Sequence, residues 1–434
     1  MIRATLLAAL FFASLPSLPA DQTPARPKPS PAATQRSGTL QALLEQAEAA
    51  LAKKDFAAAI EALKKFLAER PEDAVAHSQL AYAYTGAGRH EEARAAYEAA
   101  LALDPKLAAA HQNLGLLLLE TDPAAALPHL ERAAELLPDR AQPQVLLGAA
   151  LERLGRSAEA VAQYRRAAAR DPQNPDARLA LGRLLLALSC AAEAEPELRQ
   201  VVALRPEFAP ARLGLAESLI AQKKWEQAAG ELNAYLQVQP EDHASRVRLA
   251  SVLLELGRLE QALAELRRAE QGGYSSPQLY SLRGYARAGL RQFEEAIVAL
   301  RQAVEMDLQD SELHARLGRL HLEQRDFSAA ERALLEALRL QPKFTDALRD
   351  LAATYYLAGQ YEAALRVLDR LAEHEPPSAS SWFMRATSYD KLDRKAEALA
   401  AYRKFVELDR GRSEKQDFQA RQRIRILTRE LKKK

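Results

Sequence analysis

Prolines recur along this 434-residue chain at an almost constant spacing. They stand at positions 71, 105, 138, 172, 206, 240, 342 and 376, so neighbouring marks lie 33 or 34 residues apart, except for one interval of three periods. Two further series, about twelve and twenty-four residues before these marks, contain small residues in eleven copies. The first runs from Ala59 through Ala93 to Ala398, and the second from Ala47 through Ala81 to Ala386, with glycine in several copies. A repeat this short cannot bury its own apolar surface, so the copies must stack on one another.

One copy, Asp73–Pro105, shows what the repeated unit is. Apolar or small residues at helical spacing predict two short amphipathic helices, separated by a turn at Gly86–Gly88 and ended by Pro105. Ala or Gly at a fixed place in each helix lets the two backbones approach closely. Alternation with a period of two is missing from the sequence, so we expect an all-α chain.

This combination of period, small crossing residues and flanking tyrosines resembles the tetratricopeptide repeat family. The resemblance covers residues 40–412 and implies a right-handed superhelical solenoid of about eleven helix-turn-helix repeats. Their expected bounds are 40–73, 74–107, 108–140, 141–174, 175–208, 209–242, 243–276, 277–310, 311–344, 345–378 and 379–412. The third repeat is one residue short and carries Pro123 and Pro128, which predicts a late or distorted second helix. The junction at 271–277 lacks its proline and is expected to be an altered turn or a hinge.

The two ends of the chain differ from the repeats. Residues 1–20 have a positive start, an apolar run and a small residue at Ala20, which is the layout of a signal peptide cleaved near that point; a buried N-terminal helix is the alternative. We therefore expect an exported protein, periplasmic or secreted. Residues 21–39 are rich in proline and alanine and are interpreted as a flexible linker.

Residues 413–434 predict a single basic amphipathic helix. Its narrow apolar stripe, Ala420, Ile424, Leu427 and Leu431, suits a helix that covers the open end of a solenoid. The alternative is a basic handle for anionic lipid or nucleic acid, but a net charge of +2 argues against a strong general affinity for nucleic acid.

Candidate catalytic residues are scarce. The single cysteine, Cys190, excludes a disulfide within the chain and a cysteine-based metal site. His314 and His321 lie seven residues apart, but they occupy places where other repeats have Tyr, Leu or Arg and are interpreted as packing residues. Phosphate-binding glycine loops and hydrolase motifs are missing from the sequence. We therefore expect no enzyme activity, no metal and no cofactor.

A binding surface is the remaining function. In the family that this chain resembles, the first helix of each pair lines a concave groove that holds an extended peptide or a helix. This resemblance places the second, fifth, ninth and twelfth residues of each repeat in the groove. The residues we predict to bind a partner there are Tyr82, Arg183, Glu217, Tyr285, Arg319, Arg349, Tyr356 and Phe383. Asn113 is the only asparagine in a first helix, so a clamp for a terminal carboxylate is not expected.

The sequence thus predicts a non-catalytic scaffold that binds segments of partner proteins, as an adaptor in envelope assembly or secretion. An alternative is an accessory module of a complex that makes or exports glycans, or a groove that binds glycan directly. Sugar grooves usually present stacked aromatic rings, whereas the two tryptophans, Trp225 and Trp382, lie in distant repeats.

Overall fold

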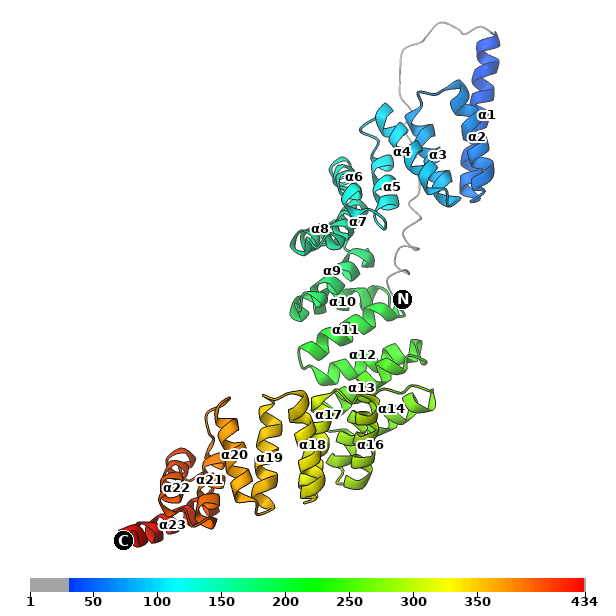
Figure 1. The fold of residues 1–434 in the computed structure, drawn as a ribbon. Coiled ribbons are helices and arrows are strands. Elements are labelled where there is room, and N and C mark those ends of the chain that lie inside the picture. Colours follow the sequence, from blue (N-terminus) through cyan, green and yellow to red (C-terminus); the bar gives the residue numbers. More distant parts are fainter. Residues whose placement is uncertain (1–30, 433–434) are drawn as a thin grey trace. The chain divides into compact units, whose positions relative to one another are not determined.

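The computed structural model describes residues 31–432, with side chains from Thr39 onward. The predicted signal peptide and the first part of the predicted linker lie outside the described residues. Within residues 31–432 the chain forms helices without a strand, in agreement with the predicted all-α class (Figure 1). The helices are α1 (Pro31–Ala52), α2 (Phe56–Glu69), α3 (Ala74–Gly86), α4 (His90–Leu103), α5 (Ala108–Leu118), α6 (Pro123–Leu136), α7 (Ala141–Arg153), α8 (Ser157–Arg170), α9 (Pro175–Ala187), α10 (Ala191–Leu204), α11 (Ala209–Ala221), α12 (Trp225–Val238), α13 (His243–Glu255), α14 (Leu259–Gln271), α15 (Pro277–Gly289), α16 (Phe293–Met306), α17 (Ser311–Glu323), α18 (Phe327–Leu340), α19 (Thr345–Leu357), α20 (Tyr361–Ala372), α21 (Ala379–Lys391), α22 (Lys395–Asp409) and α23 (Glu414–Lys432).

The helices group into two compact units, one up to Gln163 and the other from Tyr164 onward, divided within α8. Apart from α8, which contains the division, an odd-numbered helix in each unit packs against the even-numbered helix that follows it, and neighbouring hairpins within a unit pack against each other. This is the stacking that the repeat predicts. At the end of the second unit α23 packs on α22, where Ala420 and Leu427 are completely buried. It thereby caps the stack.

The start of α1 corrects the predicted linker. Residues 31–39 were expected to be unstructured, but α1 begins at Pro31 and continues through them into the first repeat. Proline is well tolerated in the first turn of a helix, because the N–H groups there have no partner within the helix. Extending an existing helix by a residue is much easier than nucleating one. Once residues 40–52 are helical, the composition of residues 32–39 allows the helix to continue through them.

The hairpins are held together where the small residues cross. Ala59, Ala93, Ala262 and the other alanines of the first series are completely buried, and so are the alanines of the second series. Glycine in the second series marks a still closer approach. A Cβ atom added to Gly182 would lie 2.6 Å from Cγ of Leu198 on the paired helix, well inside contact distance. The register inferred from the sequence is therefore the one that packs the core.

Arginines at the fourth position of repeats five, six and seven add hydrogen bonds between the two helices of their hairpins. Each donates to a glutamate nineteen residues later on the paired helix and to the carbonyl oxygen of the proline that ends the preceding repeat. The glutamate partners are Glu197 for Arg178 at 2.7 Å, Glu231 for Arg212 at 2.9 Å and Glu265 for Arg246 at 3.0 Å. The carbonyl partners are Pro172, Pro206 and Pro240. Each arginine thus ties both helices of its hairpin to the turn before it.

The turns inside the hairpins share one backbone conformation. In ten repeats the fifteenth residue has a positive φ, in the left-handed region that favours glycine. Four repeats have glycine there, but six have a side chain: Lys54, Ser189, Lys223, Arg291, Arg325 and Asp393. The left-handed conformation costs a residue with a Cβ roughly 1 kcal/mol. These turns are therefore set by the packing of the two helices and not by local preference.

The third repeat closes its turn differently. Its second helix was expected to start late or to be distorted. It does not start late: α6 begins at Pro123, directly after Asp122, whose side chain accepts from the N–H of Ala125 at 3.0 Å, and it continues through Pro128. Asp122 is a favourable cap and Pro123 a favourable first helical residue. The residue that the third repeat lacks is therefore missing from the turn after α5, and α6 starts earlier in its repeat.

The junction at 271–277 is a turn within one unit. Gly273 takes a positive φ of 82°, and the Ser276 side chain caps α15 by accepting from the N–H of Leu279 at 3.1 Å. Both sides of the junction belong to the unit that starts at Tyr164, whereas the division of the chain falls within α8. The altered-turn interpretation fits this geometry.

Two glycines have open surroundings, so substituting them tests backbone strain without creating a clash. An added Cβ would meet nothing within 4 Å at Gly257 or at Gly230, but Gly257 has a φ of +70° whereas Gly230 lies inside α12. Gly257→Ala is expected to lower the free energy of unfolding by about 1 kcal/mol. The matched Gly230→Ala is expected to raise it by about 0.5 kcal/mol, because alanine is the better helix former. Urea unfolding followed by circular dichroism measures both changes, and an equal effect of the two substitutions would contradict the strained turn.

Candidate functional site

The first helices of the repeats form one layer of each unit. In the second unit α9 approaches α11, α13 approaches α15, α17 approaches α19 and α19 approaches α21; in the first unit α3 approaches α5 and α5 approaches α7. Within the described chain, second helices of neighbouring repeats do not come together to this extent. First helices therefore stand closer to one another than second helices do, so they line the inner side of each stack. We call the exposed side of this layer the first-helix face.

The fifth position of the repeats does not lie on this face, which corrects one predicted site residue. Phe383, at this position, is 6% exposed, and its ring lies 5.1 Å from that of Phe405 and 6.4 Å from that of Tyr402. Leu179 and Val247, at the same position in their repeats, are also buried. At this position the Phe383 ring packs against two rings of the paired helix α22. Phe383 is a core residue.

The ninth position does lie on the first-helix face. Arg183 and Arg319 are exposed, Glu217 is half-buried, and the Tyr285 side chain is 62% exposed. Ser251 and Ala353 occupy the same position in α13 and α19 and are half-buried. Four of the eight predicted residues are thus arranged in a single row, one on each of four first helices of the second unit.

Ion pairs join neighbouring helices along this row. Glu217 on α11 accepts from Arg248 on α13 at 2.6 Å, and Arg319 on α17 donates to Asp350 on α19 at 2.8 Å. Burial raises the pKa of Asp350, while the Arg319 guanidinium opposes that rise. Both pairs connect the ninth residue of one repeat with the sixth residue of the next, 31 positions further on. Sequence reasoning missed Arg248 and Asp350, although opposite charges at this spacing were a signal for both.

The remaining predicted residues are partly used by the fold. Tyr82 is half-buried and meets the edge of Phe56 with ring centres 6.5 Å apart, and Tyr356 meets Tyr361 at 6.3 Å. Arg349 donates to Glu375 at 2.8 Å and to Asp346 at 2.5 Å. The pKa of Arg349 is raised, first by its hydrogen bonds to Glu375, and the pKa of Glu375 is lowered by the same contact.

The histidines behave as packing residues. His314 and His321 are 9% and 4% exposed, as expected from their place in the repeat. In the first unit His111 and His129 face each other with Nδ1 atoms 3.1 Å apart, and His111 also contacts the carbonyl oxygen of Pro105 through Nε2. Burial, followed by the charge on His111, lowers the pKa of His129, and burial lowers that of His321. Within residues 31–432 the side chains of His, Cys, Asp and Glu do not gather in threes that could hold a metal ion.

Comparison with known proteins identifies the repeated hairpin. Sequence models described as tetratricopeptide repeat match residues 50–116, 141–184, 191–246, 281–343, 322–386 and 379–412. A search of curated proteins found no match. No helix within residues 31–432 combines the length and the apolar character needed to cross a membrane.

Solved structures with a similar fold include several repeat proteins of low sequence identity. YrrB, described as a tetratricopeptide repeat protein with an unusual peptide-binding site, is 20% identical over 41% of this chain and 92% of its own, with a TM-score of 0.36. The Cut9–Hcn1 hetero-tetramer of APC/C is 13% identical over 89% of this chain and 96% of that one, with a TM-score of 0.43. PilF of Pseudomonas aeruginosa is 22% identical over 50% of this chain and 99% of its own, with a TM-score of 0.44.

Paired and unpaired arginines on the first helices are expected to respond differently to charge reversal. Arg349→Glu removes pairs with Glu375 and Asp346 and brings three carboxylates together, so the free energy of unfolding should fall by about 1 kcal/mol. Arg183→Glu is the matched control, because Arg183 is exposed and contacts no carboxylate among residues 31–432; its change should stay within about 0.5 kcal/mol. Thermal melting of both variants makes the comparison. Equal melting temperatures would show that the Arg349 pairs contribute nothing.

The lowered pKa of His129 and of His321 predicts a pH dependence of stability. Both side chains are held neutral in the folded chain and take up a proton more readily once unfolded, near the ordinary pKa of about 6.5. Their contribution to stability is therefore complete above about pH 6.5 and is lost as the pH falls through the lower folded values. Carboxylates such as Glu195, whose pKa is lowered to about 2, stabilise the folded chain at neutral pH, and this stabilisation is lost only below their ordinary pKa of about 4.5. The melting temperature should thus begin to fall below about pH 6.5.

Substitution of these histidines tests the assignment. His129→Gln together with His321→Gln should flatten the fall in melting temperature between about pH 6.5 and 5. His374→Gln serves as the control, because His374 is an exposed residue at the end of its repeat. The same slope in the double variant and in the control would rule out the buried histidines as its source.

Proposed function

The chain belongs to the tetratricopeptide repeat family, a family of protein-interaction scaffolds, and we propose that it binds an extended or helical segment of a partner protein along the first-helix face of its second unit. The observation that carries this proposal is Tyr285. Its side chain is 62% exposed at the ninth position of α15, in the middle of the row that Arg183, Glu217 and Arg319 extend on α9, α11 and α17.

Tyr285 differs from the other aromatic residues of the first helices. Tyr82 meets Phe56, Tyr356 meets Tyr361, and Phe383 lies in the core, so each of these rings has a structural use. Tyrosine supplies a large apolar surface and a hydroxyl at a small cost in side-chain entropy, which is why it dominates protein interfaces. An exposed tyrosine on a rigid helix is suited to bind a side chain of a partner.

The charged residues of the row are suited to fix the register of that partner. Glu217 and Arg319 are already oriented by Arg248 and Asp350, so they need little further ordering when a partner binds. Arg183 is exposed and can pair with an acidic residue of the partner. The alternative of a glycan groove is less favoured, because the ninth position carries only Tyr82 and Tyr285 as aromatic residues, in different units.

The setting of this interaction is the second part of the proposal. An adaptor role in envelope assembly or secretion would place the scaffold outside the cytoplasm, which rests on the signal-peptide layout of residues 1–20. An interaction scaffold without catalytic activity is consistent with the scarcity of catalytic motifs.

Site-specific photo-crosslinking tests the proposed face. A photo-reactive phenylalanine at position 285 is expected to capture a defined partner protein, which mass spectrometry can identify by the crosslinked segment. The same probe at Val298, which is 57% exposed on the second helix α16, is the matched control and should not capture that protein. An excess of unlabelled wild-type chain should abolish the crosslink, whereas an excess of Tyr285→Ala should compete at least about tenfold less well. Equal capture at both positions, or equal competition by both chains, would refute the proposal.

A further inference from the structure

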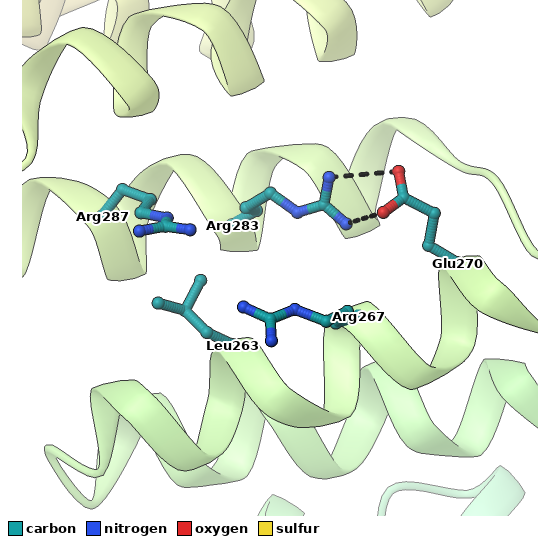
Figure 2. A pocket seen from close by; sticks show the side chains of 5 residues that line it. All are labelled: Leu263, Arg267, Glu270, Arg283 and Arg287. Atoms are coloured by element: carbon teal, nitrogen blue, oxygen red, sulfur yellow. Dashed lines mark hydrogen bonds and ion pairs between the residues drawn. The ribbon is translucent and has the colours of Figure 1, made fainter.

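We infer that the contact between α14 and α15 contains a binding site for a phosphate group, formed by Arg267, Arg283 and Arg287. This site lies between the second helix of one repeat and the first helix of the next, and it is separate from the row at the ninth positions. Figure 2 shows the hollow and the five side chains that line it, which are these three arginines, Leu263 and Glu270. Its volume is about 140 Å³.

Two positions at this hollow that are leucine in preceding repeats are arginine in the eighth repeat. The seventh residue of the repeats from 74 to 276 is leucine throughout, as at Leu249, but in the eighth repeat it is Arg283. The eleventh residue of that repeat is Arg287, where the two preceding repeats have Leu219 and Leu253. Leucines at these positions are buried, whereas Arg283 and Arg287 are only half-buried. Two arginines whose charged ends must stay hydrated or paired cannot fill the space that two leucines would occupy.

One of the three arginines is fully engaged within the chain. Arg283 forms two hydrogen bonds to Glu270, at 3.1 and 2.7 Å, and its guanidinium lies over the ring of Tyr280 at 5.1 Å. Glu270 also accepts from the Tyr280 hydroxyl at 3.1 Å, and its pKa is lowered, first by Arg283. The only carboxylate that lines the hollow is therefore committed to Arg283.

The other two arginines leave positive charge in the hollow. Arg287 donates to Gln292, which is neutral, and Arg267 has no hydrogen-bond or ion-pair partner among residues 31–432. In Figure 2 their guanidinium groups extend from opposite helices into the gap between α14 and α15, with Leu263 beside them. Three arginines and one glutamate give the hollow two excess positive charges. Two like charges that face a common space favour an anion between them.

The geometry favours a phosphate over a carboxylate. Guanidinium groups present paired N–H donors that match the oxygens of phosphate, and an acceptor with more than two oxygens gives two such groups from different directions separate acceptor atoms. A phosphate carries close to two negative charges near neutral pH, which balances the excess charge of the hollow. Leu263 provides an apolar wall for an organic group attached to that phosphate. The same chemistry fits inorganic phosphate and a phosphate ester, and the experiment separates them.

Thermal melting of the full chain with added anions is the test. At pH 7.5 and constant ionic strength, about 20 mM inorganic phosphate is expected to raise the melting temperature by about 2 °C, because a ligand that binds the folded state stabilises it. Phenyl phosphate should give a larger rise if an ester is the natural ligand and an equal rise if free phosphate is. Acetate at the same concentration should give none, and an equal rise with acetate would overturn the assignment to phosphate.

Variants of the arginines connect the effect to the hollow. Arg287→Gln and Arg267→Gln should each weaken phosphate binding about tenfold in isothermal titration calorimetry, and Arg287→Lys should lie between Arg287→Gln and wild type. Arg268→Gln is the matched control: it removes the same charge from α14, the helix that carries Arg267, but Arg268 pairs with Glu265 and does not line the hollow. Removal of Arg287 or Arg267 should also leave the melting temperature without phosphate unchanged or higher, since it relieves repulsion. An undiminished phosphate effect in both glutamine variants, or an equal loss in Arg268→Gln, would refute the site.

Discussion

The close crossing of helices at the buried alanines and glycines is the constraint from which the rest of this structure follows. With Ala262 completely buried and Gly182 too close to Leu198 for a Cβ, the two backbones of a hairpin can meet in only one register. That register decides which residues of a first helix turn to the paired helix and which remain on the face. The row at the ninth positions, the ion pairs between repeats and the hollow beside α15 are all consequences of it.

The sequence predicts the fold well because this constraint is local and repeated. A small residue recurring every 34 positions is visible without any knowledge of tertiary contacts, and helix bounds follow from nearby signals such as the Asp73 and Ser276 caps. Prediction failed at two helix starts where proline was taken as a break and not as a first-turn residue. Asp122 caps α6 directly before Pro123, and α1 begins at Pro31 and continues into the first repeat.

The candidate site was less predictable than the fold, for a physical reason. The direction of a side chain depends on how its helix is rotated within the hairpin. Groove positions taken from a family resemblance give that rotation only approximately. Phe383 was therefore placed on the face although it is a core residue, whereas Tyr285 and Arg319 are exposed on their first helices. The pairing of Arg319 with Asp350 depends on the distance between two helices. The hollow follows from arginine at positions where leucine is expected, a departure visible in the sequence once the core positions are known.

The chain is less stable than its fold allows, because six of its turns hold a residue with a side chain in the left-handed conformation. These residues are Lys54, Ser189, Lys223, Arg291, Arg325 and Asp393. Each of these residues holds a conformation that is disfavoured by roughly 1 kcal/mol. The array therefore carries several kcal/mol of strain that its architecture does not require. Chains selected for adequate stability retain such strain, because nothing removes it once folding is secure. Relief of this strain at any of the six turns would stabilise the array. It could thereby compensate for destabilising changes elsewhere in the repeats, including changes on the binding face.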